Sequence, residues 1–146
     1  MSGRPAARPG TTGTIVLLTR LARAVFLRSS VDLVGMALRN MVTLAYLRDH
    51  PGVSQQQMTE DLSMDSNTGV LVLNDLEDLD YVERRRDPAD RRRHLVDITV
   101  AGLEALEQAE IAQGSIEEEI LGGLSASERA ELRRLLVKAL REHQPD

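Results

Sequence analysis

Apolar residues recur at intervals of three or four positions along most of this chain, which is the spacing of amphipathic helices. Six helices are expected from this spacing, from the capping residues that precede them and from the glycines and prolines that end them. They cover residues 12–30, a segment between Gly35 and Pro51, residues 55–62, a segment from Asp65 to Leu79, a segment from Thr99 to Gly122, and residues 126–142. The chain is therefore predicted to be mainly α.

One segment departs from the helical spacing, between the fourth and fifth expected helices. Residues 81–86 and 95–98 are short and strand-like, and the residues between them include Asp87, Pro88 and Asp90, which favour turns. Two strands around a polar turn predict a two-stranded β-hairpin. The expected order is four helices, the hairpin and two further helices.

The composition narrows the class of protein. A chain of 146 residues fits one domain, and 42% apolar residues with only 2% aromatic predict an aliphatic core. The absence of Cys excludes disulfides and thiolate metal sites. The longest apolar runs are far shorter than the roughly 18 residues of a membrane-spanning helix, and no secretory signal is visible. We expect a cytoplasmic protein, with residues 1–11 as a flexible arm before a single domain over residues 12–146.

The net charge of −5 hides an uneven distribution of charge. Residues 1–48 carry seven Arg and one acid, residues 84–93 carry six Arg and two Asp, and residues 99–146 carry ten acids and five basic residues. Arg outnumbers Lys by 17 to one, which suits forked contacts to phosphate, although a GC-rich genome produces the same bias. The two basic regions are compatible with a nucleic-acid partner despite the acidic total.

Two short helices joined by a tight turn over residues 53–79 have the spacing of a helix-turn-helix. In such a unit the second helix enters the major groove, and its first residues face the base edges. Ser66, Asn67 and Thr68 hold that position and can bond to bases or phosphates. Gly69 is a poor helix former, and a close approach of the backbone to DNA would explain it. A plain helical hairpin, with these polar residues as caps, is the alternative.

Six arginines crowd the predicted hairpin, at residues 84–86 and 91–93. A polyanion would relieve their mutual repulsion, and each phosphate contact would release counterions. An Arg at a hairpin tip can also enter the narrow minor groove. A solvated basic loop is the alternative, but a hairpin directly after a helix-turn-helix has the position of a wing. The two features together favour binding of duplex DNA.

Residues 81–102 resemble the wing signature of the MarR family, in which an Asp-x-Arg pair precedes a hydrophobic strand, a Thr and a Gly. Asp90 and Arg92 match the pair. Residues 98–99, which are Ile-Thr, and Gly102 match the remainder. The similarity covers about residues 35–110 and is most specific at the wing.

This resemblance implies a fold and a mode of action. The DNA-binding lobe would span residues 35–100, and residues 12–34 and 101–146 would supply the dimerisation helices. The homodimer would place two winged lobes on one palindromic site, with Arg92 in the minor groove and Asp90 orienting it. Many members of this family are repressors that small phenolic or lipophilic ligands release from DNA. We therefore expect a transcriptional repressor with an effector of that kind.

The expected binding residues follow from these assignments. The residues expected to contact DNA are Ser54, Gln55, Ser66, Asn67, Thr68, Arg84, Arg85, Arg86, Asp90, Arg91, Arg92 and Arg93. The residues expected to line an effector site between the dimer helices and the winged lobe are Phe26, Met41, Leu44 and Leu47, for which core packing is the alternative.

No cofactor, metal site or catalytic site is expected. His50, His94 and His143 are far apart in the sequence and lack the spacing of metal ligands. No phosphate-binding glycine loop or nucleophile motif is present. An enzyme that degrades a small molecule would need residues that the chain does not offer.

The expected recognition helix departs from the family pattern, because residues 65–80 contain five acids and no Lys or Arg. In one interpretation the acids lie on the far side or near the helix C-terminus, where they pair with wing arginines. In the other, the protein binds DNA weakly or selects an unusual site, and Asp75 would be the most damaging acid if it faced phosphate. The second interpretation motivates an alternative function, which is a winged-helix module for protein–protein interaction with weak or no DNA binding.

Overall fold

The structure is a computed structural model that describes residues 12–29 and 36–141. Its elements are α1 (Thr14–Arg28), α3 (Leu38–Asp49), β1 (Val53–Ser54), α4 (Gln55–Asp61), α5 (Ser66–Asp78), β2 (Val82–Arg86), β3 (His94–Ile98), α6 (Val100–Ile120) and α7 (Ala126–Arg141). The helices and the hairpin follow the predicted order, and β1 is an additional strand. The predicted arm, residues 1–11, lies outside the described residues.

Side-chain caps begin four of the helices, at positions that the sequence predicts. Ser54, Asp65 and Thr99 each accept a hydrogen bond from the backbone N–H three residues ahead, at 3.1, 2.7 and 3.0 Å. Helix α7 begins with a capping box, in which Ser125 and Glu128 exchange side-chain-to-backbone bonds of 2.9 and 3.2 Å. These caps set the first turns of α4 and α5, and therefore the positions of the residues expected to meet DNA.

The predicted two-stranded wing is present as the hairpin of β2 and β3, and the sheet also contains a third strand that was not predicted. The sheet is antiparallel, with the order β1-β3-β2, and β1 contributes Val53 opposite Val96. A strand of two residues has no periodicity that a sequence pattern could reveal. Its pairing fastens the beginning of α4 to the base of the β2–β3 hairpin, so the helix-turn-helix and the wing are parts of one framework.

The core is aliphatic, as predicted, and lies in the lobe formed by α3, α4, α5, the sheet and the first part of α6. Leu44, Met58, Leu76, Val96 and Leu106 are completely buried there. In contrast, α1 and α7 contain no buried residue. The described chain by itself therefore has one packed lobe and two helices whose apolar faces are uncovered.

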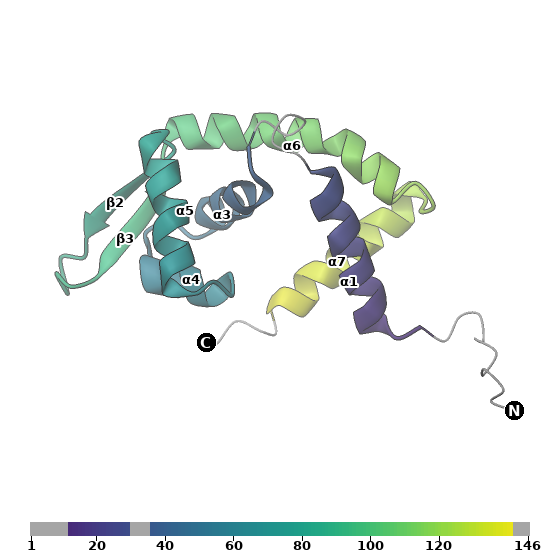
Figure 1. The fold of residues 1–146 in the computed structure, drawn as a ribbon, viewed down its shortest axis with the longest axis horizontal. Helices are drawn as coiled ribbons and strands as arrows, with labels where there is room; N and C mark the ends of the chain where they lie inside the picture. The colour runs from purple at the N-terminus through teal and green to yellow at the C-terminus, as the bar shows by residue number, and fades with distance from the viewer. Residues whose placement is uncertain (1–11, 30–35, 142–146) are drawn as a thin grey trace, which may run out of the picture.

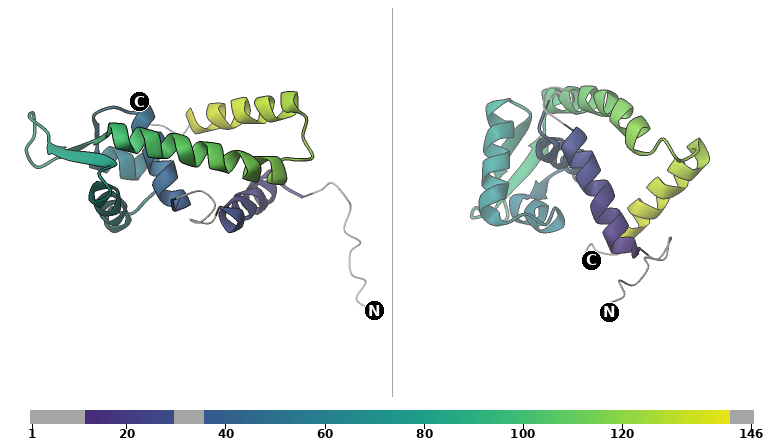
Figure 2. Two further views of the ribbon diagram at one scale, coloured as in Figure 1. Left: turned by 90° about the horizontal axis from the view of Figure 1, so that it is seen from above. Right: turned by 45° about the vertical axis from the view of Figure 1, so that its right-hand side comes forward.

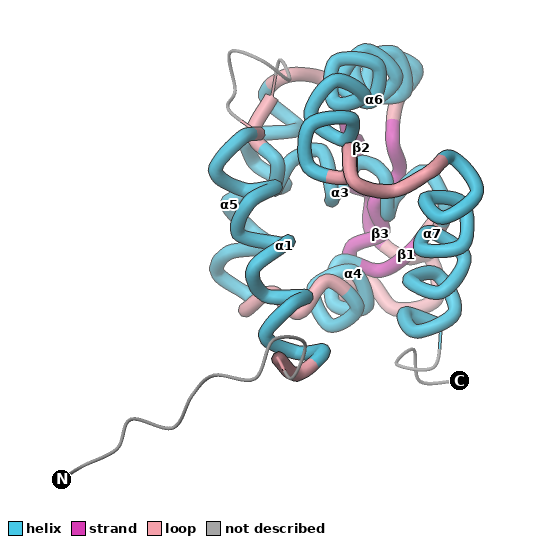
Figure 3. The backbone as a smooth tube through the Cα atoms, turned by 90° about the vertical axis from the view of Figure 1, so that its right-hand side faces the viewer, coloured by secondary structure: helices cyan, strands magenta, loops and turns pink. Residues whose placement is uncertain are grey.

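Helix α6 connects these two parts of the molecule. It has 21 residues and runs from the wing, at one end, to α1 and α7 at the other (Figure 1). Helices α1 and α7 both lie toward the end of α6 that is away from the hairpin, and the view from above in Figure 2 and the view in Figure 3 place them on opposite sides of α6. None of the helices in the described ranges combines the length and hydropathy needed to span a membrane.

A close contact fixes the beginning of α6 against the hairpin. A Cβ atom at Gly102 would lie 2.2 Å from the carbonyl oxygen of Tyr81, so no larger residue fits without movement of the backbone. The same carbonyl accepts a hydrogen bond from the Thr99 N–H at 3.0 Å. The glycine of the wing signature is thus explained by packing between α6 and the end of α5–β2, and it holds the wing at a fixed angle to the long helix.

Candidate nucleic-acid interface

Helix α5 buries one side and exposes the other. Its buried side chains are Val72, Leu73 and Leu76, which face the core. Its exposed residues are Ser66, Asn67, Val70, Leu71, Asn74, Asp75, Glu77 and Asp78. The Asp65 carboxylate caps the helix through the Thr68 N–H, and that bond lowers the pKa of the carboxyl group. The predicted contact residues Ser66 and Asn67 are therefore presented to solvent at an ordered helix N-terminus.

Gly69 has a different role from the one expected. A Cβ atom at this position would lie 2.3 Å from Cγ2 of Thr59, and the residue is buried between α4 and α5. The glycine permits the two helices of the helix-turn-helix to pack closely. The expectation that it allows the backbone to approach DNA is wrong, because its missing side chain would point into the protein.

The supporting helix α4 is also tied to α3 by polar contacts. The Tyr46 hydroxyl donates a hydrogen bond of 2.5 Å to Asp61, whose other oxygen accepts from Gln57 at 2.8 Å. Burial, followed by the bond to Asp61, raises the pKa of the Tyr46 phenol, so the hydroxyl keeps its proton and remains a donor. The pair formed by α4 and α5 is therefore held rigidly on the core.

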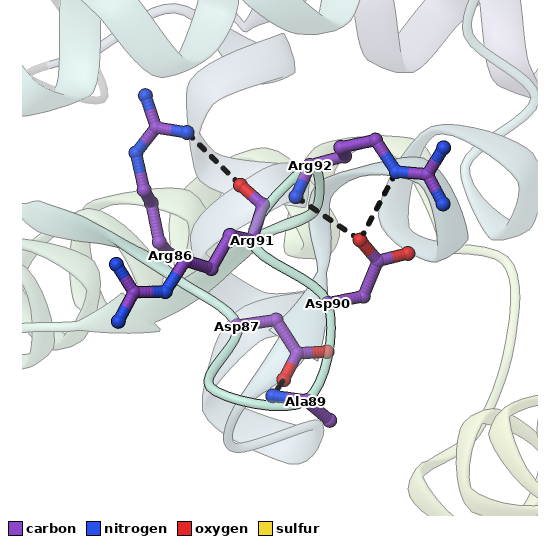
Figure 4. A network of polar contacts seen from close by, with 6 residues as sticks. All are labelled: Arg86, Asp87, Ala89, Asp90, Arg91 and Arg92. Atoms are coloured by element: carbon purple, nitrogen blue, oxygen red, sulfur yellow. Dashed lines mark hydrogen bonds and ion pairs between the residues drawn. The ribbon is translucent and has the colours of Figure 1, made fainter.

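The tip of the wing is an ordered turn that displays arginines (Figure 4). Asp90 accepts hydrogen bonds from the backbone N–H of Arg92 at 3.1 Å and from its Nε at 3.3 Å. The Arg92 side chain is 92% exposed, so its outer guanidinium nitrogens remain available to a partner. Arg86 donates to the carbonyl oxygen of Arg91 at 2.9 Å, and Asp87 accepts from the N–H of Ala89 at 2.9 Å. The acids of the turn thus shape it and orient Arg92.

Two arginines at the base of the wing are engaged within the protein. Arg84 donates to both carboxylate oxygens of Glu77, at 3.0 and 3.1 Å, and to Oδ1 of Asn74 at 2.7 Å. The bond to Arg84 lowers the pKa of Glu77, and the bond to Glu77 raises the pKa of Arg84. Arg85 pairs with Asp97 at 3.1 Å. Arg84 therefore joins the wing to α5, whereas the arginines nearer the tip carry charge that faces solvent.

The helix-turn-helix and the wing share one concave surface. A hollow of about 310 Å³ lies between the beginning of α4, the beginning of α5 and the end of the wing. Its lining residues are Ser54, Gln55, Gln56, Thr59, Ser66, Val70, Arg92, Arg93 and His94. The N-terminus of α5 adds a partial positive charge to that of the two arginines. This surface can attract a polyanion and can present short polar side chains to it.

Known proteins with a similar sequence identify the family. The model of the MarR family matches residues 34–93. A protein described as the transcriptional regulatory protein for the hcr operon of Thauera aromatica is 30% identical over 132 residues, which are 89% of this chain and 75% of that protein. The chain belongs to the MarR family. A second relative, the HTH-type transcriptional repressor NicR of Pseudomonas putida, is 32% identical over 99 residues, which are 68% of this chain and 63% of NicR.

Two solved structures of transcriptional regulators have a fold similar to that of this chain. A mutant MarR from E. coli complexed with operator DNA is 26% identical, with a TM-score of 0.67 over 86% of this chain and 95% of that chain. The PcaV transcriptional regulator from Streptomyces coelicolor, in complex with its natural ligand, is 26% identical, with a TM-score of 0.70 over 92% of this chain and 96% of that chain. The similarity includes the helices outside the winged lobe.

In this MarR-family chain, the predicted DNA-contacting residues fall into two groups. Ser66, Asn67 and the wing tip lie on or beside the concave surface, whereas Arg84 and Arg85 are ion-paired at the wing base. Ser54 is nearly buried, because its hydroxyl caps α4. The residues on or beside this surface that sequence reasoning missed are Gln56, Thr59, Val70, Leu71 and His94. Gln56 and Thr59 lie on the first two turns of the predicted helix that begins at Gln55. Their closeness in sequence to the predicted contact residue Gln55 is the signal that could have identified them.

Of the four residues expected to line an effector site, three lie together in the core on α3 and the fourth lies apart from them on α1. Met41, Leu44 and Leu47 are buried in the core, and Phe26 is exposed on α1. An apolar cavity of about 500 Å³ lies elsewhere, between α1, α6 and α7, and none of the four residues lines it. Its lining residues are Leu18, Leu21, Ala22, Val25, Glu110, Gln113, Gly114, Ile116, Glu117, Ile120, Leu121, Leu132 and Leu136. For the three core residues, the structure shows the packing role that the sequence offers as the alternative.

Of the two histidines that the structure describes, His50 packs against Tyr46 and His94 is exposed. The His50 ring stacks on Tyr46 with centroids 4.1 Å apart, and its Nδ1 lies 2.8 Å from the Tyr46 carbonyl oxygen. His94 is exposed at the start of β3, opposite Arg86, and His143 lies outside the described residues. Within residues 12–29 and 36–141, no cluster of three His, Asp or Glu side chains could hold a metal ion.

Proposed function

We propose that this chain is a transcriptional repressor that binds a palindromic site in double-stranded DNA as a homodimer. The observation that carries the proposal is the shared concave surface, where Ser66 on α5 and Arg92 and Arg93 on the wing face one hollow. One stretch of duplex can meet both elements, with α5 in the major groove and the wing tip beside the minor groove. We place the protein in the cytoplasm, where a bacterial-type repressor meets its DNA. NicR, named a repressor, and the MarR–operator complex support this assignment by likeness.

Electrostatics at the wing tip supplies the affinity in this proposal. Arg86, Arg91, Arg92 and Arg93 are exposed, and only Arg92 pairs with a carboxylate among the residues that the structure describes. That carboxylate contacts Nε and leaves the outer nitrogens of the guanidinium for phosphate or the minor groove. Because each neutralised phosphate releases counterions, binding should weaken steeply as salt is raised.

The uncovered helices support the homodimer. Apolar side chains of α1 and α7 are exposed in the single chain, among them Ile15, Phe26, Leu135 and Leu140. A second copy packed by two-fold symmetry would cover them and would fill the cavity between α1, α6 and α7. We therefore assign the dimerisation role to residues 12–34 and 101–146, and the DNA-binding role to residues 35–100. Two lobes held this way match a site with two half-sites.

Replacement of Arg92 by Ala tests the proposal. The variant should lose affinity for a selected duplex severely, and the slope of log K against log salt should become less steep by about 0.9 for each phosphate that the variant no longer neutralises. The dimer should remain intact, because the β2–β3 hairpin that carries Arg92 lies at the other end of α6 from α7 and away from α1 (Figure 1). Arg39→Ala removes an exposed arginine on α3 and serves as the control. Unchanged affinity in Arg92→Ala would contradict the wing assignment, and failure to bind any duplex at low salt would favour the protein-interaction module.

A small lipophilic or phenolic effector completes the proposed function. PcaV, which was solved with its natural ligand, supports this part by likeness alone. We assign no residues to an effector site, because we propose that the second copy of the chain fills the cavity between α1, α6 and α7. Release of the repressor from its selected duplex by a panel of phenolic acids, followed by fluorescence anisotropy, tests it. A panel without effect on DNA binding would count against a phenolic effector.

A further inference from the structure

The reading face of α5 is unusual because aliphatic side chains occupy its middle. Val70 is 37% exposed and Leu71 is 51% exposed, although the same helix buries three other aliphatic residues. Val70 follows Ser66 by one helical turn, and Leu71 follows Asn67 by one turn, so the two aliphatic residues extend the row of predicted base contacts. Val70 also lines the hollow that contains the wing arginines.

The polar groups on this face restrict which bases it can read. Residues 65–80 contain no Lys or Arg, so the commonest reader of guanine is missing from the helix. The Oδ1 atom of Asn74 accepts a bond from Arg84 at 2.7 Å, so this amide is not free to pair in both directions with adenine. Asn67 is exposed on the first turn and remains available for an adenine edge.

Aliphatic side chains have one specific partner in the major groove, which is the methyl group of thymine. From the exposed Val70 and Leu71, the available amide of Asn67 and the lack of a guanine reader, we infer that α5 selects A·T pairs. Val70 and Leu71 contact thymine methyl groups, and Asn67 bonds to an adenine edge. Asp75 could accept from cytosine, but it lies beyond the first two turns, from which most base contacts come. This inference rests on the proposed function and specifies the DNA that the protein prefers.

Replacement of thymine by uracil provides the test, because it removes only the methyl group. The homodimeric full chain first selects sites from a random duplex library, and A·T pairs are expected where α5 contacts each half-site. Each contacted thymine in a selected site is then replaced by uracil. A loss of about fourfold in affinity per uracil is expected, which is the factor for withdrawing one methyl-sized group from a buried contact.

Two variants test whether the loss of affinity caused by uracil depends on the side chains of Val70 and Leu71. Val70→Ala and Leu71→Ala should each abolish the uracil effect at one position of the half-site, while the salt dependence of binding stays the same. Both variants should fold, because Ala favours helix at exposed positions at least as well as Val and Leu. Leu79→Ala removes an exposed aliphatic side chain at the other end of the same helix and should keep the full uracil effect.

The outcomes separate this inference from the proposed function. Two results would contradict the inference that α5 recognises thymine but would leave the proposed repressor function standing. They are salt-dependent binding whose affinity does not change with uracil, and selection of G·C pairs opposite α5. A uracil effect that persists in both Val70→Ala and Leu71→Ala would overturn the assignment of these side chains. Absence of binding to every duplex at low salt would instead overturn the proposed function itself.

Discussion

Replacing Glu77 by Gln is expected to destabilise the winged lobe slightly and to make DNA binding more dependent on salt. The Glu77 carboxylate accepts two bonds from Arg84, at 3.0 and 3.1 Å, and its charge compensates that of the guanidinium. A Gln amide can accept one bond but carries no charge. Arg84 would then keep an uncompensated positive charge, held only by neutral groups such as Asn74, beside the surface proposed to face DNA.

The magnitudes follow from the exposure of this pair. The side chains of Arg84 and Glu77 are 21% and 44% exposed, and pairs near the surface contribute about 0.2–1 kcal/mol to stability. The two-bond geometry favours the upper end of this range, so we expect the free energy of unfolding to fall by about 1 kcal/mol. With a urea m-value of about 2 kcal/mol/M, the unfolding midpoint would fall by about 0.5 M. If the released Arg84 reaches a phosphate, the slope of log K against log salt should steepen by up to about 0.9 per subunit.

Urea unfolding followed by circular dichroism and DNA binding followed by fluorescence anisotropy over a salt series would measure both effects. Glu83→Gln is the matched control, because Glu83 is exposed on β2 next to Arg84 and the described part of the chain gives it no ion pair. It changes the net charge equally and leaves the Glu77–Arg84 pair intact. The same salt slope in both variants, or a Glu77→Gln protein as stable as the parent, would refute the idea that Glu77 withholds the charge of Arg84 from DNA.

Three further predictions concern packing, acid stability and assembly. Gly102→Ala places a Cβ within 2.2 Å of the Tyr81 carbonyl oxygen and should lower the free energy of unfolding by about 1–3 kcal/mol in urea denaturation; an unchanged midpoint would contradict this contact. Arg84 lowers the pKa of Glu77 below 4.5, so the contribution of this pair to the free energy of unfolding is complete above about pH 4.5 and is lost as the pH falls through the lower pKa of the folded state. An acid titration should therefore show a larger loss of stability in the parent than in Glu77→Gln. Equal losses would argue against the pair. Leu136→Glu puts a charge in the apolar cavity of α1, α6 and α7 and should give folded monomers in sedimentation velocity, whereas a persistent dimer would place the interface elsewhere.

Much of the fold follows from local signals that tertiary packing reinforces. Asp65 and Thr99 cap helices in the structure as they do in the sequence pattern, because a cap depends on residues only three positions apart. The third strand escaped prediction since β1 has two residues and exists only through its pairing with β3. The role of Gly69 also does not follow from its own helix, because the close neighbour that requires a glycine there is Thr59, on another helix. A pattern of residues along the chain does not show which elements contact one another.

The site was predictable to a similar extent. The wing arginines and the first turn of α5 could be singled out by residue type and order, but their shared hollow depends on the angle that β1 and Gly102 impose. The interpretation that acids near the C-terminus of α5 pair with wing arginines agrees with the Glu77–Arg84 pair, but the sequence does not indicate which arginines are engaged. Arg84 lies seven residues from Glu77, and only the return of β2 along α5 brings them within 3.0 Å. The sequence does not single out Val70 and Leu71, because exposed aliphatic residues on a helix carry no signal until their neighbours are known.

Much of the acidic net charge is paired with arginine or lies away from the surface proposed to face DNA, whereas Asp75 on α5 and Glu83 on β2 are exposed and have no ion pair among the described residues. Glu77 is paired with Arg84, and on α6 the residues Glu110, Glu118 and Glu119 form ion pairs of 2.8, 2.5 and 2.8 Å with arginines. Glu118 and Glu119 lie near the end of α6 that is away from the wing (Figure 1). A helix of 21 residues is about 30 Å long, whereas charges are screened within about 8 Å at physiological salt. A phosphate beside the wing tip would therefore meet the field of the nearby arginines and little of the −5 that the whole chain carries.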